Sequence, residues 1–268
     1  MVLKDRSKKS FLWALGVIFL GVFLLTPPVW QLRGGSVSIE TGDKEAQVGE
    51  NHEGWLSIGE ISQHTVHAFI TAEDARFYQH SGVDMKAIWD SIRLNWKHKK
   101  YMRGGSTITQ QVVKLAFLGP EKTLFRKIRE GLGALLLEVI VDKEQILEWY
   151  LNLVPMGGDI RGVFAASKYY FDEEPSLLTV QKSIQLALIL PRPTKGALIL
   201  RKKELTVFGH KRFYQIVKDM HDYGYLSVAL KENVLATGNF GKPIEMAQAT
   251  PLRAKNHVQS RTSEGEAP

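Results

Sequence analysis

The sequence predicts a mainly helical protein that is preceded by a single transmembrane helix. Apolar residues recur at helical spacing along most of the chain, and no convincing run of alternating strand residues interrupts them. A length of 268 residues with 44% hydrophobic content suits one domain, or two lobes that share a core. The expected helices cover residues 60–81, 84–97, 107–118, 123–141, 143–153, 162–171, 178–190 and 205–224.

The N-terminus predicts an uncleaved membrane anchor. Residues 11–32 contain no charged side chain, and their apolar run is long enough to span a bilayer. The preceding basic tail, residues 1–10, favours a cytoplasmic N-terminus, with everything after the anchor on the far side of the membrane. A cleaved signal peptide is the alternative, but Thr26, Pro27 and Pro28 follow the run without a small-x-small cleavage site.

Composition divides the remaining chain. Residues 33–55 are rich in Gly, Ser and charge and predict a linker, residues 56–240 predict the catalytic domain, and residues 241–268 predict a disordered tail. The net charge of +7 favours an anionic partner such as a membrane surface. The absence of Cys excludes disulfides, thiolate metal sites and a Cys nucleophile. The basic patches at 201–203 and 211–212 lack the interleaved aromatics of a single-strand binder. We therefore expect these patches to be solvated or membrane-facing, and we expect no nucleic acid.

The segment TAEDARFYQHSG, residues 71–82, places a carboxylate on an apolar helix face. Gly82 is expected to cap this helix, and burial would raise the pKa of Glu73 toward the range of a general base. A partly exposed Glu at the edge of an imperfect stripe is the alternative. The residues that share its face are Val66, Phe69, Ile70, Phe77 and His80.

The segment GGSTITQQVVK, residues 104–114, predicts a capped helix start that binds phosphate. Thr107 and Gln110 form a capping-box pattern, and a helix N-terminus attracts anions. Thr107, Gln111 and Lys114 then share a polar face that suits a diphosphate. An ordinary capped helix with a polar face is the alternative.

The segment RKIREGLGALLLE, residues 126–138, predicts a helix with an ion pair, Arg126 and Glu130, beside the small residues Gly133 and Ala134. Small residues next to the pair suit a groove wall, whereas the alternative is a surface ion pair. The expected core face of this helix consists of Leu124, Ile128, Leu132, Leu135 and Val139.

Two further segments carry weaker signals. In KEQILEWYLNLVPMG, residues 143–157, most apolar residues suggest core, while Tyr150 and Asn152 can orient polar groups at a cleft. The basic amphipathic stretch at 85–101 suits either a membrane headgroup region or a helix packed on the core. No HExxH pattern or mixed His/carboxylate cluster appears, so we expect no built-in metal site.

Taken in order, EDARFYQHSGVD, GGSTITQQ, RKIRE, KEQILEWYLN and GVFAASKYYF resemble the successive motifs of the peptidoglycan glycosyltransferases, which polymerise lipid II. The resemblance runs from about residue 60 to 193. We expect the monofunctional type, because no transpeptidase domain follows. It implies a lysozyme-like helical lobe with a smaller membrane-associated jaw, on the outer side of a bacterial plasma membrane.

The resemblance also implies roles for residues. Glu73 matches the general base of an inverting transfer that makes β-1,4 glycan and releases undecaprenyl diphosphate, and Glu130 matches the second carboxylate. Positions matching substrate-binding residues or supports of the base are Asp74, Phe77, His80, Thr107, Gln110, Gln111, Lys114, Arg126, Lys127, Tyr150 and Asn152.

The partners implied are lipid II, the growing glycan, an anionic membrane, and transpeptidase or cell-division proteins. A divalent ion, Mg²⁺ or Mn²⁺, at the diphosphate is a further implication. The chain departs from the family pattern at Leu115, Asp172 and Lys182. Two other functions compete with polymerisation: a membrane-anchored, lysozyme-like enzyme that cleaves peptidoglycan, and a catalytically weak scaffold that binds lipid II.

Overall fold

The computed structural model describes residues 21, 25–41, 44–99, 104–119, 121–238 and 240, and this part is mainly helical. The α-helices are α2 (Gln63–Glu73), α3 (Met85–His98), α4 (Ile108–Phe117), α5 (Leu124–Ile140), α6 (Lys143–Leu153), α7 (Gly162–Phe171), α8 (Val180–Ala187), α9 (Pro193–Lys202), α10 (Val207–Asp222) and α11 (Val228–Thr237). The 3₁₀ helices are η1 (Val29–Gly34), η2 (Ile58–Glu60), η3 (Phe77–Gln79) and η4 (Pro175–Leu177). The strands form two antiparallel pairs, β1 (Ser36–Thr41) with β2 (Lys44–Gly49) and β3 (Pro155–Gly157) with β4 (Ile160–Arg161).

Side-chain caps fix where most helices begin. Each capping residue has extended backbone angles, and its side chain accepts a hydrogen bond from a backbone N–H in the first turn, a group that lacks a partner within the helix. These caps explain why the predicted and observed starts agree closely for most of the expected helices. The capping residues are Asp84, Thr107, Thr123, Asp142, Thr179, Thr206 and Ser227.

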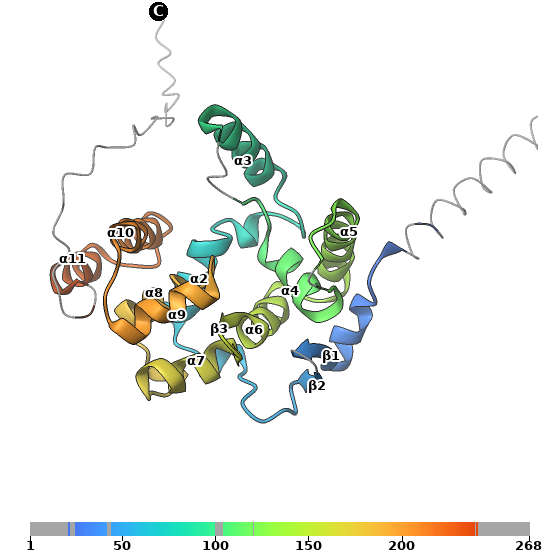
Figure 1. The fold of residues 1–268 in the computed structure, drawn as a ribbon, viewed down its shortest axis with the longest axis horizontal. Helices are drawn as coiled ribbons and strands as arrows, with labels where there is room; N and C mark the ends of the chain where they lie inside the picture. Colours follow the sequence, from blue (N-terminus) through green and yellow to red (C-terminus); the bar gives the residue numbers. More distant parts are fainter. Residues whose placement is uncertain are drawn as a thin grey trace, which may run out of the picture.

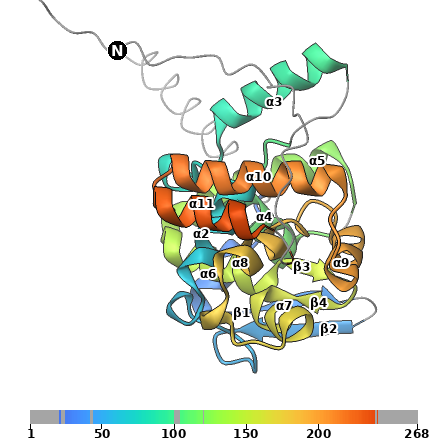
Figure 2. The ribbon, with the colours of Figure 1, turned by 90° about the vertical axis from the view of Figure 1, so that its left-hand side faces the viewer.

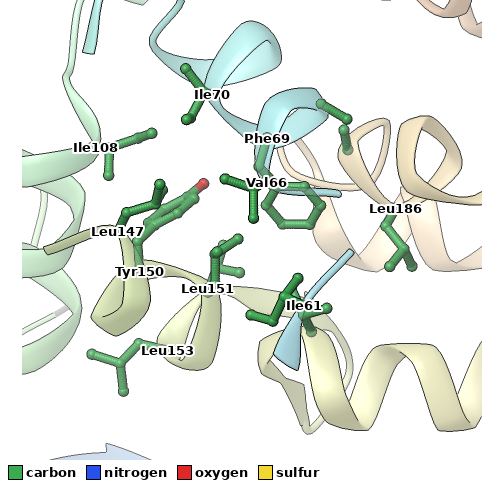
Figure 3. Packing of buried hydrophobic residues seen from close by; sticks show 14 of the residues in the cluster. Ile61, Val66, Phe69, Ile70, Ile108, Leu147, Tyr150, Leu151, Leu153 and Leu186 are labelled. Atoms are coloured by element: carbon green, nitrogen blue, oxygen red, sulfur yellow. The ribbon is translucent and has the colours of Figure 1, made fainter. Parts of the chain in front are cut away.

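The core lies between α2, α4, α6 and α8 (Figures 1 and 3). Phe69 of α2 meets Tyr150 of α6 edge to face, with ring centroids 6.5 Å apart. Both side chains are fully buried, as are Ile108 of α4 and Leu186 of α8. In Figure 1 the hairpin and α5 lie on one side of this core, and α10 and α11 on the other. The core therefore supports the ends of α2 and α4.

Part of the predicted linker, residues 33–55, forms the β1–β2 hairpin. The β1–β2 hairpin pairs Ser36 with Gly49, and β1 contacts α4. Val29, Leu32 and Val37 are buried in the main core. Val37 sits among Gly, Ser and charged neighbours, so the average composition of the segment concealed it. Two unpredicted helices, α9 and α11, also belong to the described fold.

The expected anchor lies largely outside the described residues. Of residues 11–32, the structure describes Gly21 and 25–32, whereas the basic tail 1–10 and the tail 241–268 are not described. Among the helices within the described ranges, none is both long and apolar enough to cross a membrane. Residues 29–32, predicted as the end of the anchor, instead form part of η1 and pack near α5.

The predicted core face of α5 is also wrong. Val139 is 81% exposed, and Leu124, Ile128 and Leu135 are exposed as well. The buried residues are Glu130, Gly133, Ala134 and Leu137. A Cβ on Gly133 would lie 2.8 Å from both Pro27 and Val113, so the small residues permit close packing rather than line a groove.

Helix α3 extends away from the body of the protein (Figure 2). Ser91 is its buried residue, and Trp96 is 85% exposed. The structure therefore excludes the alternative in which this stretch packs on the core as an ordinary amphipathic helix. Further exposed apolar side chains on α3 are Met85, Trp89, Ile92 and Leu94.

Candidate active site

Glu73 is the last residue of α2, and its side chain is 17% exposed. The Gln111 side chain on α4 donates a hydrogen bond to its Oε2 over 2.9 Å. The Arg212 guanidinium on α10 lies 3.8 Å from its Oε1. Burial raises the pKa of Glu73, while the Gln111 hydrogen bond and the Arg212 and Lys114 charges oppose this rise. Glu73 is therefore a poorly solvated carboxylate with oriented partners.

The helix that carries Glu73 ends earlier than the sequence predicted. Asp74 has non-helical backbone angles, and Gly82 caps no helix. The Asp74 carboxylate accepts a hydrogen bond from His80 Nε2 at 3.0 Å and another from the Ile108 backbone N–H at 3.0 Å. These bonds link the end of α2 to the start of α4. They draw Asp74 out of the helix and fix the backbone next to Glu73.

The capping box at the start of α4 is confirmed, but its threonine is occupied. Thr107 and Gln110 bond reciprocally, and Thr107 Oγ1 also donates to the Gly82 carbonyl over 2.6 Å. Both side chains are buried. Thr107 therefore holds two segments together and does not present a free hydroxyl to a ligand.

Glu130 is buried and held by two cations of its own helix. Arg126 forms an ion pair with Glu130, and the Lys127 ammonium lies 2.6 Å from its Oε2. Lys127 also donates to the Ser106 hydroxyl over 2.8 Å. Burial and the neighbouring positive charges of Lys114 and Arg126 lower the pKa of Lys127 to about 8. Lys114, Arg126 and Lys127 form what we call the cation cluster.

The side chains around Glu130 do not fit a divalent metal ion. Such ions favour several oxygen ligands, whereas this single carboxylate already contacts Arg126 and Lys127. Elsewhere in the described ranges, Asp74, His80 and Asp84 have ligand-type atoms within 4.8 Å of one another. Both carboxylates already have side-chain partners, because Asp74 bonds His80 and Asp84 bonds the Arg76 guanidinium.

A cavity of about 230 Å³ opens beside Glu73, between α3, the loop before α4 and the segment after α10; we call it the Glu73 cleft. In Figure 2, α3 stands above α10. Charged residues form nearly half of the lining, and one lining residue, Tyr223, is aromatic. The charged lining residues are Glu73, Asp74, Arg76, Asp84, Lys86 and Asp90. Ser106 joins the Glu73 cleft to the cation cluster through Lys127.

Three other predicted site residues, Phe77, Tyr150 and Asn152, have structural roles in the described fold. Phe77 is buried, with the Lys143 ammonium 4.3 Å from its ring centroid. Tyr150 is fully buried within the core, and burial raises its pKa. The Asn152 side chain accepts a hydrogen bond from the Leu56 backbone N–H and donates one to the Leu56 carbonyl. Asn152 lines a different cavity, so the structure does not bring it to Glu73.

Sequence reasoning missed Arg212 and Tyr223. The basic patch that includes Arg212 is predicted to be solvated or membrane-facing, yet Arg212 also donates to the Ala72 carbonyl over 3.3 Å. A signal was available, because Arg212 adjoins the buried stripe of α10, which includes Gly209, Phe213 and Ile216. Tyr223 lies beyond that helix and carried no motif.

The profile of the transglycosylase family matches residues 41–221. The chain belongs to the transglycosylase family. Similar members of the transglycosylase family include the biosynthetic peptidoglycan transglycosylases of Nitrosomonas eutropha and Shewanella oneidensis. The first is 37% identical over 188 residues (68% of this chain, 77% of the relative), and the second 40% over 197 residues (69% and 82%). Penicillin-binding protein 1F of Bacillus subtilis is 35% identical over 239 residues, and the matched part covers 88% of this chain but 33% of that relative.

The three residues that depart from the transglycosylase pattern take no part in the hydrogen bonds described above for Glu73 and Glu130. Leu115 packs against the core, and Asp172 takes the left-handed conformation, with φ 56°, that ends α7. Lys182 lies 5.6 Å from the Phe171 ring centroid and pairs with Glu173. Asp172 and Lys182 therefore form local contacts around α7 and α8, whereas Leu115 belongs to α4.

Proposed function

We propose that this protein polymerises lipid II into β-1,4-linked glycan strands and releases undecaprenyl diphosphate. The observation that carries the proposal is a poorly solvated carboxylate, Glu73, near Lys114, which belongs to a cluster of three cations. The names of the relatives support peptidoglycan as the product. A hydrolase that cleaves glycan has no diphosphate to hold, so the cation cluster favours the polymerase over the lysozyme-like alternative.

In the proposed reaction, Glu73 accepts the proton of the 4-hydroxyl of the incoming sugar. The hydroxyl oxygen forms a bond to the anomeric carbon of the growing chain, and the bond from that carbon to the diphosphate oxygen breaks with inversion. Gln111 orients the carboxylate, and the raised pKa of Glu73 makes it an effective base near neutrality. Asp74 and His80 would support it by fixing the backbone beside it.

The cation cluster would hold the diphosphate and stabilise its charge as it leaves. Lys114, Arg126 and Lys127 supply the positive charge, and Glu130 positions the latter two. The donor set favours these cations over a divalent ion as the source of charge neutralisation. The positive charges of Lys114 and Arg126 lower the pKa of Lys127. A bound diphosphate that pairs with Arg126 would offset this effect.

We further propose that the body corresponds to a lysozyme-like lobe and α3 to a membrane-associated jaw. The exposed tryptophans of α3 and the positive net charge support contact with an anionic bilayer. A single N-terminal anchor in a bacterial plasma membrane, with the domain on its outer side, would keep the protein close to a lipid-linked substrate. Transpeptidases or cell-division proteins would be its partners.

Incubation of the detergent-solubilised protein with labelled lipid II, with and without Glu73→Gln, tests the proposal. We expect a ladder of polymer from the wild type and none from the variant, because the amide cannot accept the proton. A folded wild type that makes no polymer but digests purified sacculi would establish the cleaving enzyme instead. A Glu73→Gln protein that replaces the wild type in cells would establish the scaffold.

A further inference from the structure

The Glu73 cleft contains an aromatic residue that the proposed reaction does not use. Tyr223 follows α10 directly, lines the same cavity as Glu73 and is 42% exposed. Its ring is nearly parallel to that of Tyr225, with centroids 6.4 Å apart and 19° between the planes. Tyr225 in turn stacks on His67 of α2 at 4.0 Å and 9°. The three rings form a column, and its outer member borders the Glu73 cleft.

The backbone holds this column in place. Gly224 lies between the two tyrosines with φ +80°, which allows the turn that brings both rings to one side. His221 Nδ1 donates to the Leu226 carbonyl over 2.9 Å, and Leu226 is buried. A ring that is already fixed loses little conformational freedom when a ligand stacks on it. Tyr223 is therefore preorganised as a flat apolar surface within a polar cavity.

The charges of the Glu73 cleft indicate what kind of ligand it takes. Four carboxylates and two cations line the cavity, and one of these cations, Arg76, is paired with Asp84. This surplus of carboxylates disfavours a diphosphate, which the cation cluster suits instead. Carboxylates accept hydrogen bonds from hydroxyl groups, and the C–H face of a pyranose packs on an aromatic ring. The walls thus fit a neutral sugar.

We infer that Tyr223 is a stacking platform for a hexose ring of the glycan substrate, with a hydroxyl of that sugar directed toward Glu73. The inference rests on the proposed function and adds a sugar-binding residue to it. The Glu73 cleft and the adjoining cation cluster then have opposite character. The diphosphate occupies the cation cluster on one side of Ser106, and the accepting sugar lies on the Tyr223 side.

Binding of chitotetraose, a neutral chain of N-acetylhexosamines without lipid or diphosphate, tests the platform. We would titrate it into full-length detergent-solubilised wild type, Tyr223→Ala, Tyr223→Phe and Tyr223→Trp. Loss of the ring should weaken binding about tenfold, while Phe and Trp retain it. In lipid II polymerisation, Tyr223→Ala should raise KM with little change in kcat. Tyr214→Ala is the matched control, since Tyr214 is a partly exposed tyrosine on α10 that does not line the Glu73 cleft.

Equal chitotetraose affinity in wild type and Tyr223→Ala would overturn the inference, as would an equal loss in Tyr214→Ala or no binding by the wild type. Near-ultraviolet circular dichroism checks the folding of each variant, and Tyr223→Leu replaces the Ala variant if that fails to fold. The two proposals fail separately. A wild type that makes no polymer, yet binds the saccharide through Tyr223, rejects polymerisation and retains the platform.

Discussion

At the scale of single residues, the site depends on two groups whose proton affinities shift in opposite directions. Burial raises the pKa of Glu73, so the ionised base is lost as the pH falls through that raised value. Burial and like charges lower the pKa of Lys127 to about 8, so its charge is lost as the pH rises. Activity should therefore be confined between an acidic limb set by Glu73 and a basic limb set by Lys127.

Removing the charge of Arg212 should move the acidic limb. Arg212→Gln deletes a cation 3.8 Å from Glu73, which raises the pKa of the base and shifts the limb of kcat/KM upward by about one pH unit. Lipid II polymerisation followed across pH measures the shift. Lys211→Gln, at the neighbouring exposed position, removes the same charge and should leave the profile unchanged. Superimposable profiles for Arg212→Gln and wild type would contradict this role.

Replacing Lys127 by arginine should extend activity to higher pH. Arginine keeps its charge at every pH at which the protein is folded, so KM for lipid II should no longer rise above about pH 8. Steady-state kinetics measured from about pH 7 to about pH 10, in steps of roughly half a pH unit, provide the measurement. Lys122→Arg, in the exposed segment before α5, is the control. If KM rises equally in Lys127→Arg and wild type, another group causes the basic limb.

At the scale of elements, helix α5 shows that hydrophobic periodicity alone does not identify the buried face of a helix. Its apolar stripe faces outward, whereas its small residues and Glu130 face the core. Its existence and both ends were predictable from the pattern and from the Thr123 cap. Which face is buried was not, because that depends on Pro27 and Val113, which approach Gly133 from distant parts of the sequence.

The two glycines of α5 should respond oppositely to substitution. Gly133→Val places atoms where Pro27 and Val113 already lie, so it should lower the free energy of unfolding by about 1–3 kcal/mol. Gly131→Ala meets its nearest neighbour, the Gln110 side chain, at 3.8 Å and should raise stability by up to about 1 kcal/mol through helix propensity. Denaturant unfolding of both variants measures the difference. An equal effect would show that the close packing near η1 is absent.

In the candidate site, too, local sequence patterns identify some residues, whereas others depend on tertiary packing. Glu73, Gln111, Lys114 and the pair around Glu130 were predictable, because each lies in a local motif with helical spacing. Arg212 and Tyr223 were not predicted, because they reach the site from α10 and the segment just after it through tertiary packing. Local spacing also failed where a predicted ligand residue, such as Asn152, uses its side chain to bind backbone.

At the scale of the whole molecule, α3 extends away from the body, and we propose that it faces the membrane. The chain has no Cys, so single cysteines can be introduced and spin-labelled cleanly. In nanodiscs with anionic lipid, a label at Trp96→Cys on α3 should be accessible to oxygen and protected from an aqueous nickel complex. A label at Leu177→Cys, an exposed position in η4, should show the reverse. Aqueous accessibility at both positions would place α3 outside the bilayer.

The position of Glu73 at the end of α2 has an electrostatic consequence. Backbone carbonyls at a helix C-terminus lack partners within the helix and carry a partial negative charge, which disfavours a nearby carboxylate in its ionised form. The helix dipole therefore acts in the same direction as burial on this base. Because Asp74 ends the helix by bonding Ile108 and His80, the junction that holds the Glu73 carboxylate also sets the field in which it titrates.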